Sequence, residues 1–173
     1  MAALTAALQT PTPTLPTNLI EELTHQFLTF RVGDAEYGVG IMAVREIKGW
    51  TDTTRLPNTP DYMRGVINLR GVIIPIFDLR CRFGRGVTDA HAKNVVVIMA
   101  VDERTIGLLV DAVSDIVTVQ PDAIKDAPQE STHDLKDRFV DGLISFEERM
   151  IVLLNITQLF RSDAEIFDQG HVS

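Results

Sequence analysis

The chain has 173 residues, 45% of them hydrophobic, and a net charge of −8 at pH 7. This length suits one domain or two small ones with a shared core, and the negative charge disfavours nucleic acid and anionic membranes as partners, because both are bound through clustered Lys and Arg. The sequence has no apolar run near the ~18 residues of a membrane span and no basic, apolar leader, and Cys81 is its single cysteine, so we expect a cytoplasmic protein without direct membrane insertion.

The first part of the chain divides into a tail and the start of a β domain. Residues 1–18 are rich in Pro and Thr and are predicted to be disordered, whereas residues 19–173 are predicted to form the ordered domain. Strands are expected around residues 27–30 and 37–39, because Phe, Leu, Tyr and Val gather there and the turn signal Gly33-Asp34 lies between them.

The next three segments are predicted to form different kinds of structure. Residues 41–47 carry an apolar side chain at every third position, which fits either a helical turn or a kinked strand. Residues 59–65 are predicted to form one helical turn, because Thr and Pro begin the segment and Gly ends it. Residues 66–77 then read as a hairpin around Arg70-Gly71, in which Pro75 indicates an edge strand or a bulge.

The second half of the chain repeats the first. Residues 142–160 align without a gap with residues 65–83 at an offset of 77, and residues 106–116 align with residues 37–47 at an offset of 69. The difference of eight residues (77 − 69 = 8) indicates an insertion in the second copy, upstream of residue 142. Such a repeat predicts two similar lobes. A residue shared by the two copies is expected to serve the fold, and one that differs is a candidate for a function of one lobe.

The second copy is expected to contain the same elements as the first. Asp78 and Asn155 occupy equivalent positions, and each is predicted to cap a short helix through its side-chain oxygen. A terminal helix is expected at residues 163–167. Strands of the second copy are predicted at residues 95–101, 105–110, 113–119, 139–146 and 150–154. Short strands at close spacing predict a mainly all-β fold, in which about five strands per lobe can close into a small barrel or sandwich.

The sequence contains no recognisable catalytic or metal-binding set. The four histidines have no acidic, Cys or His partner at metal-ligand spacing, and neither a Gly-x-Ser-x-Gly motif nor a phosphate-binding loop is present. Cys81 lies between apolar residues of a predicted helix and is expected to be a packed thiol. We therefore expect a binding module without enzymatic activity, metal or cofactor.

Comparison of the copies selects candidate binding residues. The first hairpin tip carries Arg70 where the second carries Glu147. This arginine is either an ordinary turn charge or an interface anchor, since Arg is enriched at interaction hot spots. If residues 41–47 form a strand, Val44 and Glu46 share a face. They are then either a core valine beside a surface acid, or an apolar groove with a charged edge.

These same segments resemble the signature of the CheW-like domain family. The resemblance rests on Gly65–Arg80, Tyr37-Gly38, and residues 44–47, 55–60 and 107–113, and it extends over about residues 25–161. It implies two intertwined five-stranded SH3-like barrels with short helices and a C-terminal helical segment. It also implies a non-enzymatic adaptor of chemotaxis signalling.

The resemblance further implies two partners, namely the cytoplasmic tip of methyl-accepting chemoreceptors and the regulatory domain of the histidine kinase CheA. The family's receptor-binding positions correspond to Val44, Glu46, Arg70 and Ile116, whereas no short motif assigns the kinase contacts. The protein would be recruited from the cytoplasm to membrane-associated receptor arrays. Two alternatives remain at this stage: a family paralogue that serves a different receptor array, and a small-molecule-binding barrel, which would need a deep polar pocket.

Overall fold

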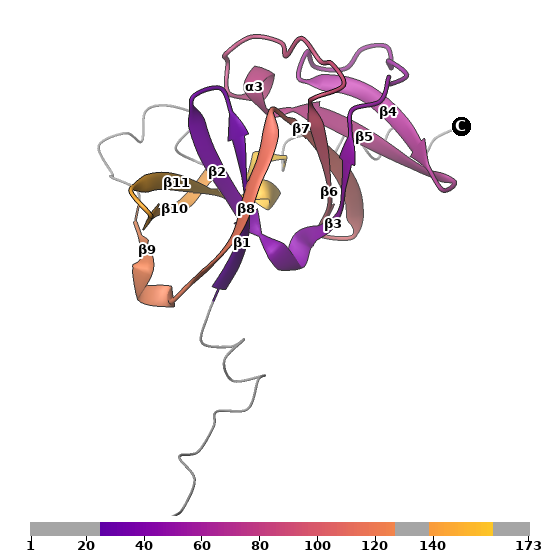
Figure 1. The fold of residues 1–173 in the computed structure, drawn as a ribbon. Helices are drawn as coiled ribbons and strands as arrows, with labels where there is room; N and C mark the ends of the chain where they lie inside the picture. Colours follow the sequence, from indigo (N-terminus) through magenta and orange to yellow (C-terminus); the bar gives the residue numbers. More distant parts are fainter. Residues whose placement is uncertain (1–24, 127–138, 161–173) are drawn as a thin grey trace, which may run out of the picture.

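The computed structural model of the chain describes residues 25–126 and 139–160. They form two twisted β-sheets with short helical turns between the strands (Figure 1). The first copy supplies β1 (His25–Val32), β2 (Ala35–Gly40), η2 (Ile41–Ala43), β3 (Val44–Gly49), β4 (Met63–Leu69), β5 (Val72–Asp78) and α3 (Leu79–Arg82). The second supplies β6 (Val95–Val101), β7 (Arg104–Val110), β8 (Ala112–Val119), η3 (Pro121–Ala123), β9 (Ile124–Lys125), β10 (Val140–Phe146), β11 (Arg149–Leu154) and α4 (Ile156–Leu159).

Each sheet is built from both copies of the repeat. The first sheet has the order β8-β1-β2-β11-β10-β9, and the second has the order β3-β6-β7-β5-β4. Strands β1 and β2 therefore pair with β8 and β11, while β6 and β7 pair in the same way with β3 and β5. This exchange confirms the intertwined, mainly β architecture. The sheets have six and five strands rather than five each. The sixth strand of the first sheet is β9, which pairs with β10; at the equivalent place in the second sheet, only a single bridge, Thr54–Val66, is formed.

The two copies keep the same register where their parallel strands meet. In the second sheet, Ile76 of β5 lies opposite Gly107 of β7. The equivalent residues of the first sheet, Leu153 of β11 and Gly38 of β2, also lie opposite each other. A Cβ atom on Gly107 would overlap Ile76, and one on Gly38 would lie 3.0 Å from Leu153. The two glycines therefore allow an apolar side chain of the neighbouring parallel strand to pack over them in both sheets.

The buried apolar residues form one large cluster shared by both copies and a smaller cluster in each sheet. The shared cluster contains Phe30 and Phe77 of the first copy together with Met99 and Leu108 of the second. Because β1 and β6 contribute to this cluster from opposite sheets, it holds the two sheets together. Residues of η2 and the start of β3 pack against its border, which positions the candidate site.

Several local predictions are confirmed. The Gly33-Asp34 turn joins β1 and β2, and the side chains of Asp78 and Asn155 accept hydrogen bonds from the backbone of α3 and α4. Residues 41–47 combine both alternatives, since the 3₁₀ turn of η2 leads directly into β3. The tip residues of both long hairpins have positive φ, as a type I′ turn requires.

Three local predictions are wrong in whole or in part. Residues 59–65 form a turn closed by a 3.0 Å bond from Met63 N–H to the carbonyl of Pro60, because strand β4 already begins at Met63 and leaves no room for a helix. The edge-strand alternative for Pro75 is wrong, since β5 lies between β7 and β4, whereas the bulge alternative agrees with the register shift of the β4–β5 ladder opposite Ile76 and Phe77. The pairing of β5 with β7 covers only Ile76–Asp78, so Pro75 lies outside that ladder. Cys81 is half-buried rather than fully packed. The predicted tail and the helix at residues 163–167 lie outside the described residues.

Candidate protein-binding site

The charged centre of the candidate site is an ion pair between two predicted residues. Nη1 and Nη2 of Arg70 donate to the two carboxylate oxygens of Glu46 at 3.1 and 3.3 Å. The pair connects the tip of the β4–β5 hairpin with the edge strand β3, two elements that are not hydrogen-bonded neighbours. Such a bidentate geometry fixes the plane of the guanidinium group.

The backbone of the hairpin tip presents Arg70 to solvent. Arg70 and Gly71 have φ values of 53° and 86°, and the side-chain oxygen of Asn68 accepts a 2.8 Å bond from Gly71 N–H. The Arg70 side chain is 76% exposed, whereas that of Glu46 is 31% exposed. A partner can therefore reach the arginine, while the less exposed glutamate fixes the orientation of its guanidinium group.

Val44 lies at the start of β3, two residues before Glu46. It is half-buried and packs against the border of the shared core. A bulge separates Val44 from Glu46, so that they lie opposite the consecutive residues Met99 and Ile98 of β6. Arg45, between them, is exposed and donates a 2.8 Å hydrogen bond to the carbonyl of Met42. Consecutive residues of a strand point to opposite faces, so Val44 shares the face of Met99 and Glu46 shares that of Ile98. The predicted shared face of Val44 and Glu46 is therefore wrong, because the bulge shifts the register between them.

Ile116 lies on a different sheet from the other three predicted residues. It belongs to β8, the edge strand of the first sheet, and is 53% exposed. Its counterpart in the first copy, Ile47 of β3, is 46% exposed. The structure thus brings Arg70 and Glu46 into contact and keeps Val44 on the same strand, but it places Ile116 in the other sheet.

The second copy lacks the ion pair at the equivalent positions. There, Asp115 replaces Glu46 and Glu147 replaces Arg70, so both side chains are acidic. Asp115 instead accepts a 2.8 Å hydrogen bond from Ile116 N–H. The Glu46–Arg70 pair is therefore specific to the first copy, although sequence reasoning selected the two residues separately and did not predict their contact.

The described residues offer little for catalysis. Burial, with the nearby carboxylates of Asp78 and Asp61, raises the pKa of the Cys81 thiol, which keeps it protonated and weakly nucleophilic near neutral pH. A hollow of about 710 Å³ lies between β1, β2, β8 and β11, and its Arg149 is already paired with Glu36 at 3.1 Å. Within residues 25–126 and 139–160, no group of three His, Cys, Asp or Glu side chains could hold a metal ion.

Comparison with known proteins assigns this fold. The family model of the CheW-like domain matches residues 26–164. The chain belongs to the CheW-like domain family. A probable chemotaxis protein CheW from Rhizobium etli is 46% identical over 135 residues, covering 78% of this chain and 86% of the relative. The chemotaxis protein CheW of Rhizobium meliloti is 43% identical over 150 residues, covering 85% and 96%.

A solved CheW structure supports the same assignment. The crystal structure of the scaffolding protein TtCheW from Thermoanaerobacter tengcongensis matches with a TM-score of 0.72 and 32% identity, over 79% of this chain and 92% of that one. Membership of the CheW family makes the chain a chemotaxis scaffold rather than an enzyme, as the sequence predicted. Among the described residues, no helix is long and apolar enough to cross a membrane.

Proposed function

We propose that the chain couples methyl-accepting chemoreceptors to the histidine kinase CheA. In this proposal it resides in the cytoplasm, joins receptor arrays at the membrane, and binds the receptor tip through Val44, Glu46, Arg70 and Ile116. The kinase regulatory domain binds elsewhere on the surface. Family membership supports the general role, and the observation that carries the receptor site is the Glu46–Arg70 pair, which the second copy lacks.

The arrangement suits a protein interface better than a pocket for a small molecule. An exposed arginine held by one carboxylate still has N–H groups directed at solvent, and Arg is enriched at binding hot spots. Val44, two residues before Glu46, provides partly buried apolar surface, and Ile116 adds an exposed apolar side chain on the neighbouring sheet. A charged group next to apolar surface is a common composition of protein interfaces.

Arg70 can either contact the receptor directly or fix the hairpin through its ion pair with Glu46. Exchanging the charges of the two residues separates these roles. We expect Arg70→Glu to weaken receptor binding by about 2 kcal/mol, roughly thirtyfold, because an attractive charge is replaced by a repulsive one. Glu46→Arg combined with Arg70→Glu restores an ion pair of opposite polarity. If Arg70 contacts the receptor directly, this double variant stays weak; if the pair only fixes the hairpin, the double variant regains affinity.

The measurement is a titration of each folded variant against a purified receptor signalling fragment and the CheA regulatory domain. Arg149→Glu is the matched control, because Arg149 forms a comparable pair with Glu36 on the other hairpin. CheA binding should survive Arg70→Glu better than receptor binding does. Unchanged receptor affinity in Arg70→Glu would reject the site, and binding of the wild-type chain to neither partner would reject the function.

A further inference from the structure

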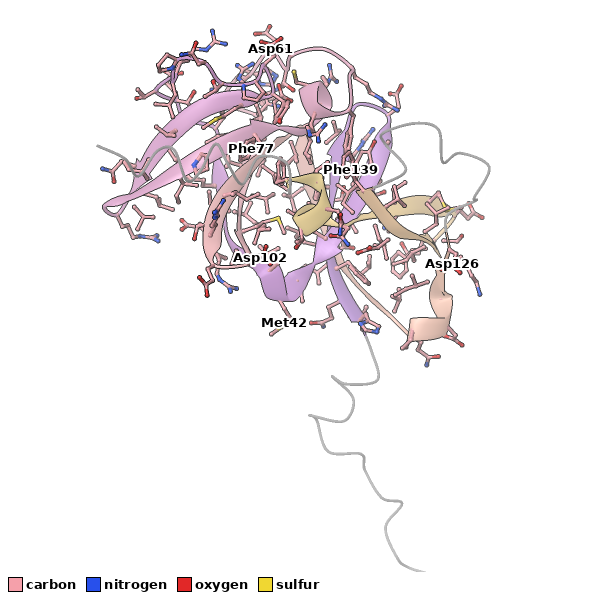
Figure 2. All side chains as sticks on the ribbon, turned by 180° about the vertical axis from the view of Figure 1, so that it is seen from behind. Met42, Asp61, Phe77, Asp102, Asp126 and Phe139 are labelled. Atoms are coloured by element: carbon pink, nitrogen blue, oxygen red, sulfur yellow. The ribbon has the colours of Figure 1, made fainter. Side chains whose placement is uncertain are left out.

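Met42 is the most exposed of the large apolar side chains in the described part of the chain. It is 85% exposed, although it lies on η2, whose other two residues, Ile41 and Ala43, pack against the shared core. Figure 2 shows Met42 at the lower end of the molecule, on the turn that leads into β3. The short turn therefore directs its central side chain into solvent.

The turn that carries Met42 is fixed by two hydrogen bonds. The backbone N–H of Val44 donates to the carbonyl of Ile41, and Nη1 of Arg45 donates to the carbonyl of Met42 at 2.8 Å. The same segment continues into Glu46 of the proposed receptor surface. Met42 thus lies on a fixed turn four residues before Glu46, while its own side chain stays exposed and able to adapt, as methionine does at protein interfaces.

The second copy shows that the fold does not need an apolar side chain at this position. Met42 aligns with Asp111, since 111 − 69 = 42. The carboxylate of Asp111 accepts a 2.7 Å hydrogen bond from Gly33 N–H and lies 3.5 Å from Arg80, so it serves the structure. In contrast, the Met42 side chain has no such structural contact to explain its presence, and an exposed apolar side chain does not stabilise a fold.

We propose that Met42 is an apolar contact residue of the chemoreceptor-binding surface, in the same segment as Val44 and Glu46. This inference rests on the proposed function, because it adds a residue to the same contact. The receptor surface that covers Met42 would be apolar, next to a carboxylate or carbonyl group that accepts hydrogen bonds from Arg70. Continuity along one segment, from Met42 through Val44 to Glu46, is the reason for assigning Met42 to this partner rather than to the kinase.

The test compares Met42 with an exposed methionine in the second copy. Met150 on β11 is 58% exposed and provides the matched control. We expect Met42→Ala to weaken binding of the receptor signalling fragment about tenfold, and Met42→Lys to weaken it further, because a charge would face an apolar surface. Met150→Ala and Met150→Lys should bind as the wild type does. All four variants should keep the wild-type melting temperature, since both side chains are exposed.

Titration of the same variants with the CheA regulatory domain completes the test. Unchanged CheA affinity in Met42→Lys, together with weak receptor binding, supports the assignment. If Arg70→Glu weakens receptor binding and Met42→Lys does not, the role of Met42 is rejected while the proposed function stands. If Met42→Lys loses CheA and not the receptor, the assignment to the receptor is overturned. If neither Met42→Lys nor Arg70→Glu changes receptor affinity, the proposed receptor site fails as well.

Discussion

At the scale of single residues, the repeat places Asp78 and Asn155 in one role but in different surroundings. Both cap a short helix, yet Asp78 is fully buried and also accepts 2.7 Å bonds from the N–H and the hydroxyl of Thr88. We expect Asp78→Ala to lower the free energy of unfolding by about 3 kcal/mol, because it leaves buried donors unpaired. Asn155→Ala should cost only about 1 kcal/mol, as for an ordinary cap. Urea denaturation of both variants measures the difference, and equal losses would contradict it.

Residue-level reasoning from the sequence identified which side chains to examine but not how they meet. Arg70 and Glu46 were both predicted as candidates, yet their ion pair joins strands that the sequence gives no means to place side by side. Met42 was missed, because the search followed apolar residues with a regular spacing and Met42 interrupts that spacing. The signal that would have found it is the comparison with Asp111, an acid at the same position of the other copy.

At the scale of elements, Gly107 of β7 leaves room for apolar side chains of the two neighbouring strands. An added Cβ would overlap Ile76 and lie 2.9 Å from Val96, whereas Gly49, at the end of β3, has no atom within 4 Å of its Cβ position. We therefore expect Gly107→Ala to destabilise the protein by about 1–3 kcal/mol through overpacking. Gly49→Ala should change stability by less than about 0.5 kcal/mol. Thermal unfolding of the two variants tests this; a Gly107→Ala protein as stable as Gly49→Ala would show that the side chains of Ile76 and Val96 can move aside.

Elements were predicted well where local chemistry determines them. The Gly33-Asp34 and Arg70-Gly71 turns and the two caps follow from residue type alone. The turn near Pro60 was misread as a helix because the same residue types favour both structures, and the early start of β4 decided between them. The exchange of strands between sheets is not encoded in local periodicity, and only the family resemblance predicted it.

At the scale of the whole molecule, the exchange of strands makes each half of the chain dependent on the other. In the first half, β1 and β2 lack their neighbours β8 and β11, and in the second half β6 and β7 lack β3 and β5. The largest apolar cluster also draws on both halves. Neither half alone can bury its apolar surface or pair its strand edges, so we expect neither to fold by itself.

This dependence can be tested by dividing the chain between Asp89 and Ala90, in the loop between α3 and β6. That position keeps the Asp78–Thr88 bonds in the first fragment and the turn from His91 to Asn94 in the second. We expect residues 1–89 and residues 90–173 each to lack a cooperative thermal transition by circular dichroism. An equimolar mixture should regain one, at a midpoint that rises with concentration because the folded state is now bimolecular. A cooperative transition in either fragment alone would show that one lobe folds without exchanged strands.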